Sequence, residues 1–540
     1  MTTTDYDVVV AGAGPVGLFL GCELGLGGAR VLVVERLTEI DETIKAGAIN
    51  IPSAVAFYRR GLLPELTAVW EAALERMRAF KKEAAGKEGA GGNAGASGRK
   101  EASGREDGEP RMPPKFAGHF AGIMMDADLF DGSAPVWAEV GPVADAGLGV
   151  PQAQLERILA ARAARLGVEV RRGVELTGFE ADEEGVTVHL GGPEAIRAGW
   201  LVGCDGGRST VRKLAGFDFP GTDPEITGYQ AVVEMSGAER LGVGWNTTDT
   251  GTYVHGPFPG RVLSVEFGGP PADRSAPVTA EELQASLRRV SGVPEVTVTK
   301  VVTATRFTDN ARQVTDYRKG RVLLAGDSAH VHSPFGGQGL NLGIGDAMNL
   351  GWKLAAVVRG RAPEALLDSY TAERRPIGAW VLDWTRAQIA VMRPDRHARA
   401  LRRVMTDLAL TTTGTTYLVT RISGVWQTYD LPGDHPLTGH SAPDLELADG
   451  TRLGDRLHTG RALLLDLTDD PGLRARAEEY DDRLDVLTAA CPARPDLAAL
   501  FLRPDGFVAW AADGGDGADA LPAALERWLG TPASIARPAA

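Results

Sequence analysis

A pattern of three glycines near the N-terminus is the first feature that could bind a ligand. Gly12, Gly14 and Gly17 lie between a β-branched run at residues 6–11 and an expected helix at residues 16–25. In this setting the first glycine permits a tight turn, the second lets a pyrophosphate approach the backbone, and the third lets the helix pack on the strand. The positive end of the helix would also attract phosphate. The pattern therefore predicts a dinucleotide-binding site.

An acid completes this pattern. Glu35 ends the next apolar run, residues 31–35, so residues 6–35 are expected to form a β-α-β unit with two parallel, buried strands. A carboxylate at that place can accept a hydrogen bond from a ribose hydroxyl. Sites for NAD and for FAD share the pattern, so both cofactors remain open at this point.

Two later segments repeat the design of an apolar strand followed by an acid. In LVGCDGGRSTVR the acid is Asp205, and Arg208 and Arg212 follow it. Alone, this segment is consistent with an ordinary turn that caps a helix. In RVLLAGDSAH the acid is Asp327, and a glycine loop at residues 336–339 then opens a helix. An acid can hold a chain of hydroxyls and a helix N-terminus can hold an anionic oxygen, so the pair indicates one extended cofactor that crosses the sheet.

Length and composition place the chain among large globular proteins. A chain of 540 residues exceeds the size at which one core stops growing, so we expect two or three domains. Hydrophobic residues at 44% and charged residues at 24% match globular averages, which argues against a disordered, fibrous or membrane protein.

Charge and cysteine content exclude further classes. The net charge of -14 argues against a nucleic-acid partner, because such binding depends on clustered Lys and Arg. Cys22, Cys204 and Cys491 form no CxxC and no cluster with His, so neither a disulfide framework nor a metal site is expected. The N-terminus has no basic leader and no apolar run reaches about 18 residues. We therefore expect a soluble, cytoplasmic protein without a membrane span.

The remaining pattern outlines the other elements. We expect a helix at residues 155–166, followed by strands up to about residue 203, and an alternating, turn-rich antiparallel region at residues 227–302. Two consecutive helices are expected at residues 343–358 and 362–385, and a domain boundary near residue 435.

Residues 84–111 differ from the rest of the chain. They mix Gly, Ala, Ser and both charges and lack large apolar side chains, so burial cannot repay the entropy of ordering them. We expect a disordered loop insertion that is dispensable for folding. A lid that folds over the substrate is the alternative.

With the three motifs in this order, the sequence resembles the class A flavoprotein monooxygenases, the para-hydroxybenzoate hydroxylase family. The resemblance is strongest to the branch that hydroxylates aromatic polyketides and rifampicin. It runs over nearly the whole chain and includes four further segments, at residues 118–122, 150–152, 370–376 and 502–506.

The resemblance implies an α/β chain with three domains. The first is a Rossmann-type FAD-binding domain at residues 1–180 with 200–225 and 300–390. The second is an antiparallel-sheet substrate domain at residues 226–300 with parts of 112–150. After a helical linker at residues 391–435, a thioredoxin-like C-terminal domain follows at residues 436–540. Because the last of these contains only Cys491, it cannot perform dithiol exchange, and we expect it to be structural or to support a homodimer.

The resemblance also implies roles along FAD. The ADP half would be held by Gly12, Gly14, Gly17 and Glu35, with Arg36, Lys45, Gln152 and Asp205 further along it. Asp327 would bind the ribityl chain, and the backbone around the isoalloxazine would come from Pro334, Gly337, Gly339, Leu340 and Asn341. The sequence departs from the family at Lys45, where Arg is common and a lysine cannot form a bidentate fork. It also departs in the insertion and at residues 50–53, where flavin mobility or substrate entry could be altered.

In the mechanism that the family implies, NADPH or NADH reduces FAD, O2 adds at flavin C4a, and the hydroperoxide transfers OH to an electron-rich aromatic substrate such as a polycyclic phenol or quinone. The protein must position this substrate and exclude water, so no catalytic triad is expected. His332, Pro334 and Phe335 are candidates for the pocket wall, whereas His330 is expected to be structural. Possible stacking surfaces are Phe120, Trp137, Tyr253, Phe258 and Phe267.

Arg208 and Arg212 are the candidates for contacts with the NADPH phosphates, unless they pair with local acids. Three other functions stay open. These are Baeyer–Villiger oxygenation, dehydrogenation, and flavin binding without turnover in an assembly protein.

Overall fold

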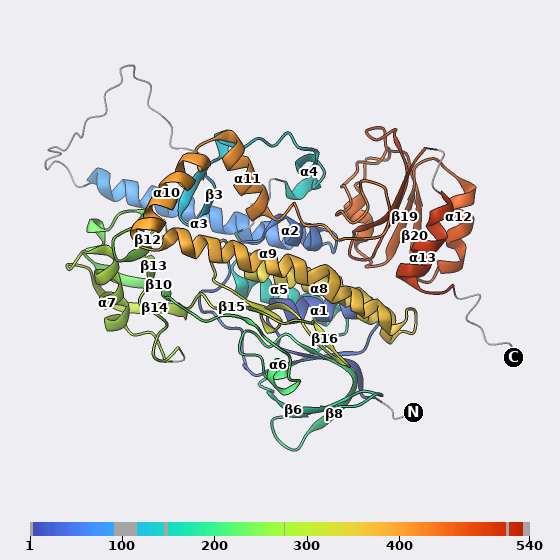
Figure 1. Cartoon of the computed structure of the whole chain (residues 1–540), viewed down its shortest axis with the longest axis horizontal. Coiled ribbons are helices and arrows are strands. Elements are labelled where there is room, and N and C mark those ends of the chain that lie inside the picture. The colour runs from blue at the N-terminus through green and yellow to red at the C-terminus, as the bar shows by residue number, and fades with distance from the viewer. Residues whose placement is uncertain are drawn as a thin grey trace.

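The computed structural model describes residues 4–90, 116–144, 149–256, 258–274, 276–514 and 518–532. Figure 1 shows three parts in a row. An antiparallel sheet with helix α7 (Ala280–Ser291) lies at one end, and a mainly parallel sheet with long helices lies in the centre. A smaller sheet with α12 (Pro471–Ala477) and α13 (Leu521–Leu529) lies at the other end.

The central sheet has eight strands. Its main order is β16-β17-β8-β1-β2-β5, and β7 pairs with β8 and β6. The strands are β1 (Tyr6–Ala11), β2 (Val31–Glu35), β5 (Glu169–Arg172), β6 (Leu176–Ala181), β7 (Val186–Leu190), β8 (Ala195–Gly203), β16 (Arg318–Lys319) and β17 (Val322–Leu324). β1 runs parallel to β2 and β8 and is joined to β2 by α1 (Pro15–Leu26), so the expected β-α-β unit is confirmed.

The parallel pairing brings the three motifs to one edge of the sheet. β17 is parallel to β8, and β8 is parallel to β1, so their carboxyl ends point the same way. Backbone hydrogen bonds continue beyond the strands, from Cys204 N to Ala11 O at 2.7 Å and from Ala325 N to Gly203 O at 3.0 Å. Ligands of such sheets bind at this edge.

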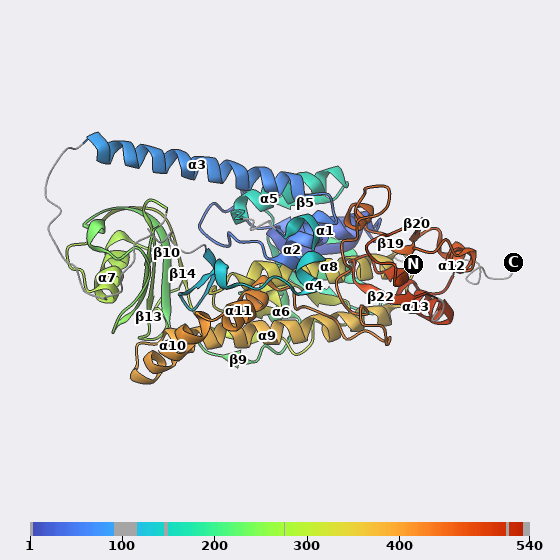
Figure 2. The same cartoon turned by 90° about the horizontal axis from the view of Figure 1, so that it is seen from above.

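Besides α1, six helices of the described residues lie around the central sheet: α2 (Ile51–Tyr58), α3 (Leu63–Ala90), α5 (Gln152–Arg165), α6 (Thr210–Leu214), α8 (Gln338–Val358) and α9 (Asp368–Met392). The helices expected at residues 155–166, 343–358 and 362–385 are confirmed, with shifted ends. The prediction of a loop from residue 84 is wrong for residues 84–90, which continue α3 and include the good helix formers Ala, Lys and Glu. Residues 91–111 of that prediction lie outside the described part. Figure 2 shows α3 along one side of the molecule, reaching toward the antiparallel sheet.

The alternating region forms a five-stranded antiparallel sheet, as expected, in the order β11-β12-β13-β10-β14. Its strands are β10 (Thr227–Ser236), β11 (Gly244–Thr247), β12 (Gly251–His255), β13 (Arg261–Glu266) and β14 (Thr297–Phe307). The sequence pattern did not predict α7 (Ala280–Ser291), whose N-terminus is capped by Thr279 and whose apolar face covers this sheet. The spacing of Thr279 and Glu282 was an available capping signal.

The helices expected at residues 391–435 are present as α10 (Arg396–Ala409) and α11 (Thr412–Ser423). They do more than link, because they pack against the hairpin of β3 (Phe116–Phe120) and β4 (Ile123–Asp126). Three short strands, β9 (Gly221–Thr222), β15 (Ala311–Gln313) and β18 (His330–Val331), form a separate sheet, and α4 (Pro135–Ala138) lies in the segment after β4.

The C-terminal part has a four-stranded sheet in the order β20-β19-β21-β22. Its elements are β19 (Ala462–Asp466), α12 (Pro471–Ala477), β20 (Leu484–Thr488), β21 (Leu497–Leu502), β22 (Val508–Asp513) and α13 (Leu521–Leu529). The turn between β21 and β22 is anchored on the central part: buried Arg503 donates to both carboxylate oxygens of Glu373 on α9, at 2.9 and 2.8 Å. Among the helices of the described residues, none combines the length and apolar character that a membrane span needs.

Candidate functional site

The turn between β1 and α1 shows why its three positions are glycines. A Cβ on Gly12, where φ is 105°, would lie 2.4 Å from the carbonyl oxygen of Cys204, and a Cβ on Gly17 would lie 1.9 Å from that of Gly12. A Cβ on Gly14 would have no neighbour within 4 Å. No side chain caps α1 and no acid lies in its first turn. The turn therefore presents unneutralised N–H groups to open space, which fits a pyrophosphate.

Glu35 holds this turn from the neighbouring strand. Its Oε2 accepts a hydrogen bond from Ala13 N and its Oε1 accepts one from Leu37 N, both at 2.9 Å. Each oxygen retains acceptor capacity for a ribose hydroxyl. Arg36 and Lys45 are exposed, and Lys45 Nζ pairs with Asp41 at 2.8 Å.

Gln152 fixes the loop at residues 44–50 from the start of α5. Its backbone N–H donates to Ala46 O at 3.0 Å, and its side-chain amide donates to Glu156 at 2.9 Å. Burial raises the pKa of Glu156, although the bond from Gln152 acts in the opposite direction. Gln152 therefore has at least one structural task at the place where the sequence predicted a cofactor contact.

Asp205 joins the second motif to the third. Its Oδ2 accepts from the N–H groups of Thr210 and Val211, at 2.7 and 3.1 Å, and its Oδ1 accepts from Ser328 Oγ at 2.9 Å. Both carboxylate oxygens thus have partners within the protein, so Asp205 acts first as a support for the edge of the sheet.

The two arginines of the second motif lie in different surroundings. The prediction of Arg212 as a phosphate contact is wrong: its guanidinium is buried, stacks over Phe219, and donates to the carbonyls of Ser328 and Gly207, both at 2.9 Å. Arg208 is exposed. Arg274 was not predicted from the sequence pattern. Partial desolvation lowers its pKa, and the nearby Arg208 lowers this pKa further, whereas Asp327 raises it. Two guanidinium groups therefore lie near one carboxylate at the open side of the sheet.

Asp327, His332 and Gly339 converge at the start of α8. A Cβ built on Gly339 would lie 3.6 Å from His332 Nε2 and 3.9 Å from Asp327 Oδ1. Asp327 is exposed and has no hydrogen-bond partner among the described residues. His332 Nδ1 lies 2.8 Å from Ser333 O, whereas its buried Nε2 has no partner in the described structure. Burial lowers the pKa of His332 to about 4, so the ring is neutral and Nε2 is a free acceptor at neutral pH.

The N-terminus of α8 is open in the same way as that of α1. Gly336 and Gly337 have φ values of 82° and 64°, and no side chain caps the helix. Asn341 in the first turn donates to Ala48 O at 3.0 Å and accepts from Asn50 N at 2.9 Å, which ties the loop at residues 44–50 to α8. Asn50 also caps α2 by accepting from Ser53 N at 3.1 Å. The uncapped N-termini of α1 and α8, the unpartnered Nε2 of His332 and the exposed carboxylate of Asp327 together fit a long dinucleotide cofactor.

His330 is structural, as expected. It is fully buried and its Nε2 lies 2.7 Å from Asp346 Oδ2, while Asp346 Oδ1 accepts from Arg374 Nε at 2.8 Å.

An aromatic wall, which we define as Phe120, Trp245, Phe307, Phe335 and Trp384, lies between the glycine loop and the antiparallel sheet. The ring centroid of Phe335 lies 6.1 Å from that of Trp245 and 5.7 Å from that of Phe307. The ring centroids of Phe120 and Trp384 are 4.8 Å apart. Phe335 and Phe120 were expected; the other three were missed because they come from distant segments.

The remaining aromatic candidates have other places. Trp137 packs on Phe130, Tyr253 is buried in the antiparallel-sheet core, Phe258 is exposed, and Phe267 packs beside the core that includes Phe120. Pro334 is exposed beside Phe335.

Comparison with known families shows to which family the chain belongs. Residues 5–385 match the FAD binding domain family and residues 435–532 match the family described as aromatic-ring hydroxylase, C-terminal. The chain belongs to the FAD-dependent aromatic-ring hydroxylases. The resemblance predicted from the three motifs is thereby confirmed, and so is an FAD-binding domain.

Relatives of this hydroxylase family match the chain from end to end. The 12-dehydrotetracycline 5-monooxygenase/anhydrotetracycline 6-monooxygenase of Streptomyces rimosus is 40% identical over 98% of this chain and 99% of its own. The dialkyldecalin synthase of Streptomyces rugosporus is 37% identical over 97% and 98%. The structure of OxyS anhydrotetracycline hydroxylase from Streptomyces rimosus has a TM-score of 0.80 at 38% identity, covering 98% of this chain and all of that one.

Proposed function

We propose that this chain is an FAD-dependent monooxygenase that uses O2 and NADPH or NADH to hydroxylate a polycyclic phenol or quinone. The observation that carries the proposal is the convergence of Asp327, the orphaned Nε2 of His332 and the N-terminus of α8 beside the aromatic wall. Relatives that are tetracycline monooxygenases support the same substrate class.

The protein residues would divide the cofactor between two helix ends. The α1 turn at Gly14 would bind the pyrophosphate, Glu35 the ribose, and Asp327 the ribityl hydroxyls. The backbone N–H groups at Gly339, Leu340 and Asn341 would meet the isoalloxazine, where the helix dipole favours negative charge. Bound FAD would supply the redox chemistry, which is hydride acceptance from a nicotinamide and activation of O2.

A nicotinamide coenzyme needs a separate, transient place. Among the described residues, β1, α1 and β2 form the single unit that carries the dinucleotide glycine pattern. Arg208 is exposed, and Arg274 lies near it beside Asp327. We assign these two guanidinium groups to the coenzyme phosphates, because such charge-assisted contacts are strong and the groups are accessible.

The aromatic wall would align a planar substrate and keep water from the reacting atoms. We keep the three-part division of the chain as part of this proposal: a Rossmann-type FAD domain, a substrate domain built on the antiparallel sheet, and a thioredoxin-like domain without dithiol chemistry.

The test is turnover under 18O2 with a panel of polycyclic phenols and mass spectrometry of the products. We expect nicotinamide oxidation that depends on the phenol, and one heavy oxygen atom in the product. The dialkyldecalin synthase relative, together with the similar solved structure of a Diels-Alderase, makes a cycloaddition without oxygen transfer the second candidate function. A product of unchanged mass, formed without nicotinamide consumption, would replace the first candidate by the second.

A further inference from the structure

Asp346, on α8, holds both ends of the segment that carries Asp327. Its Oδ2 accepts from the backbone N–H of Gly326 at 3.0 Å and lies 2.7 Å from His330 Nε2. Because a carboxylate only accepts hydrogen bonds, Nε2 is the donor in the second contact. The side chain of Asp346 is fully buried, so water does not compete for either bond. Asp346 therefore fixes the backbone on both sides of Asp327 from within the core.

The turn held in this way has little freedom of its own. Gly326 has a φ of 63°, and a Cβ on it would lie 3.1 Å from Val16 of α1. On the other side of Asp327, Ser328 Oγ donates to Asp205 at 2.9 Å. The carboxylate of Asp327 itself has no hydrogen-bond partner among the described residues. The direction in which it points is therefore set by the residues that hold its neighbours.

Arg374, on α9, extends this support away from the flavin site. Its Nε donates to Asp346 Oδ1 at 2.8 Å, one Nη donates to Leu342 O at 2.9 Å, and the other donates to the hydroxyl of Tyr429 at 3.3 Å. Burial alone would raise the pKa of Asp346, but His330 and Arg374 lower it below its ordinary value, so the group is ionised at neutral pH. A continuous series of buried bonds thus leads from Gly326 to Tyr429.

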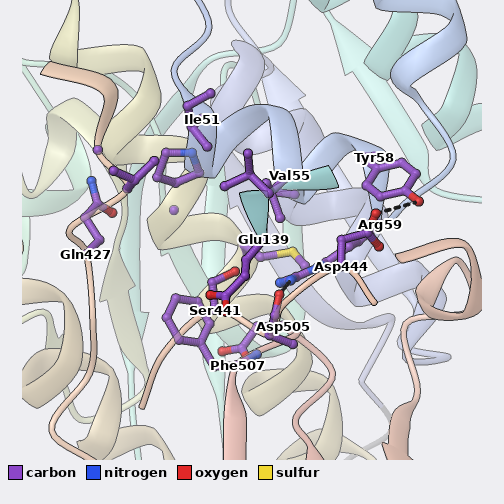
Figure 3. Close-up of a pocket in the computed structure, with 18 of the residues that line it drawn as sticks. Ile51, Val55, Tyr58, Arg59, Glu139, Gln427, Ser441, Asp444, Asp505 and Phe507 are labelled. Carbon is purple, nitrogen blue, oxygen red and sulfur yellow. Dashed lines mark hydrogen bonds between the residues drawn. The ribbon is translucent and has the colours of Figure 1, made fainter. Parts of the chain in front are cut away.

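Tyr429 connects this series to the C-terminal part. Its ring stacks on that of Phe507, with centroids 4.1 Å apart, and the Arg503 guanidinium lies 5.3 Å from its ring centroid. Tyr429 and Phe507 both line a small cavity of about 80 Å³, and Figure 3 shows Phe507 across it from Val55 of α2. The hydroxyl of Tyr429 therefore reaches the central part while its ring packs on the C-terminal part.

Two consecutive residues of α9 join the two parts. Glu373 accepts from Arg503, and the next residue, Arg374, binds Asp346 and Tyr429. We infer that Asp346 is a positioning residue for FAD, which holds Asp327 toward the ribityl hydroxyls, and that Arg374 and Tyr429 make the C-terminal part a component of this support. The inference rests on the assignment of Asp327 to FAD in the proposed function. It gives the C-terminal part a task in cofactor binding.

Titration of FAD into the FAD-free protein, followed by flavin fluorescence, tests the inference. Asp346→Asn replaces one of the acceptor oxygens by a donor, and we expect the Kd of FAD to rise about tenfold to a hundredfold. Tyr429→Phe keeps the stacked ring and removes the hydroxyl, and should raise this Kd about twofold to tenfold. Tyr229→Phe is the matched control, because it removes a hydroxyl that donates to Glu282 at 2.8 Å in the antiparallel-sheet part. It should leave the Kd unchanged.

A double-mutant cycle separates positioning from general loosening. If Asp346 acts through Asp327, the double variant Asp327→Ala/Asp346→Asn should bind FAD at most about threefold more weakly than Asp327→Ala alone. Loosening of the whole fold would instead multiply the two losses. Should Asp346→Asn fail to fold, Tyr429→Phe with and without Asp327→Ala forms the same cycle. The inference is overturned if Asp346→Asn or Tyr429→Phe binds FAD like the wild type, or if the losses multiply.

These measurements need no turnover, so they can be separated from the test of the proposed function. A product of unchanged mass under 18O2 would replace the proposed reaction and leave the FAD titrations valid. Wild-type FAD affinity in Asp327→Ala would remove the assignment of Asp327 and overturn the inference with it. Loss of FAD in Asp327→Ala together with wild-type affinity in the Asp346 and Tyr429 variants would overturn the inference alone.

Discussion

The side-chain amide nitrogen of Asn341 lies 3.0 Å from the carbonyl oxygen of Ala48. The same side chain donates to Gly337 O at 2.7 Å and accepts from Asn50 N at 2.9 Å. One residue therefore holds the loop at residues 44–50 against the first turn of α8, at the place where we put the isoalloxazine. Gln152 and Thr305 also bond to this loop, but Asn341 is the residue whose side chain ties it to α8, almost 300 residues away in the chain.

Replacing Asn341 should therefore weaken FAD binding. Asn341→Ala removes three hydrogen bonds from a buried side chain, and we expect the Kd of FAD to rise by about tenfold to a hundredfold. Flavin fluorescence during titration of the FAD-free protein measures this Kd. Asn246→Ala is the matched control, since its amide donates to two backbone carbonyls of the antiparallel sheet. An equal rise in both variants would mean that the effect is general loosening.

Asp327 should be needed to retain the cofactor. The purified wild-type protein is expected to be yellow with FAD, and Asp327→Ala should lose most of it, because its free carboxylate would no longer accept from the ribityl hydroxyls. The absorbance ratio of flavin to protein after gel filtration measures the occupancy. Asp383→Ala removes an exposed carboxylate that pairs with Arg386 and should keep full occupancy. Full occupancy in the Asp327 variant as well would show that this acid does not hold FAD.

The arginines of the second motif should separate by phenotype. Arg208→Ala and Arg274→Ala should each raise the NADPH concentration needed for half-maximal flavin reduction by about tenfold to a hundredfold, with FAD content nearly unchanged. Arg212→Ala should instead lower the melting temperature, because it leaves two buried carbonyls without donors. Stopped-flow reduction and thermal melts measure the two effects. Normal reduction kinetics in both exposed variants would remove them from the coenzyme site.

Local features of this site were predictable from the sequence. The roles of Gly12 and Gly17 follow from contacts within and beside one turn, and their spacing encodes that turn. The capping pair of Thr279 and Glu282 also carried enough information to predict α7, although the alternating pattern on either side of it hid the signal.

Long-range features were not predictable, because spacing along the chain does not report them. The buried position of the Arg212 guanidinium depends on its hydrogen bond to the carbonyl of Ser328, which is 116 residues away in the chain. The aromatic wall combines side chains from a hairpin, two strands of the antiparallel sheet, a loop and α9, and Arg274 meets Arg208 only after the sheet has folded. Such groupings arise from packing rather than from a motif.

The buried contact between the central and C-terminal parts should be far more important for stability than a surface ion pair. Glu373 accepts from Arg503 and pairs with Lys353 at 3.0 Å, and all three side chains are buried. Glu373→Gln should cost about 3–5 kcal/mol of unfolding free energy, because it leaves buried cations with too few anions. Glu364→Gln, which breaks the more exposed pairs with Arg318 and Arg321, should cost about 0–1 kcal/mol. Urea unfolding of the two variants measures the difference, and similar losses would contradict it.

Two histidines should make the protein less stable in mild acid. Burial lowers the pKa of His119 and that of His332 to about 4, well below the ordinary value of 6.5. Between pH 6.5 and 4 the unfolded chain therefore binds more protons at these sites than the folded chain does. Stability falls as pH falls through this window, by an amount on the order of 3 kcal/mol for each histidine near pH 4.

His119 allows this effect to be measured at a residue that holds no part of the proposed flavin site. It packs on Trp245 with ring centroids 4.5 Å apart, and its Nδ1 accepts from Gly122 N at 3.3 Å. His119→Asn removes the titrating ring from both the folded and the unfolded chain. The drop in melting temperature from pH 7 to pH 4.5 should therefore be smaller than in the wild type, even if the variant is less stable at pH 7. His397→Asn, at an exposed position on α10, should keep the wild-type drop. Differential scanning calorimetry at both pH values measures these drops, and an unchanged drop in His119→Asn would show that this histidine is not held neutral in the folded protein.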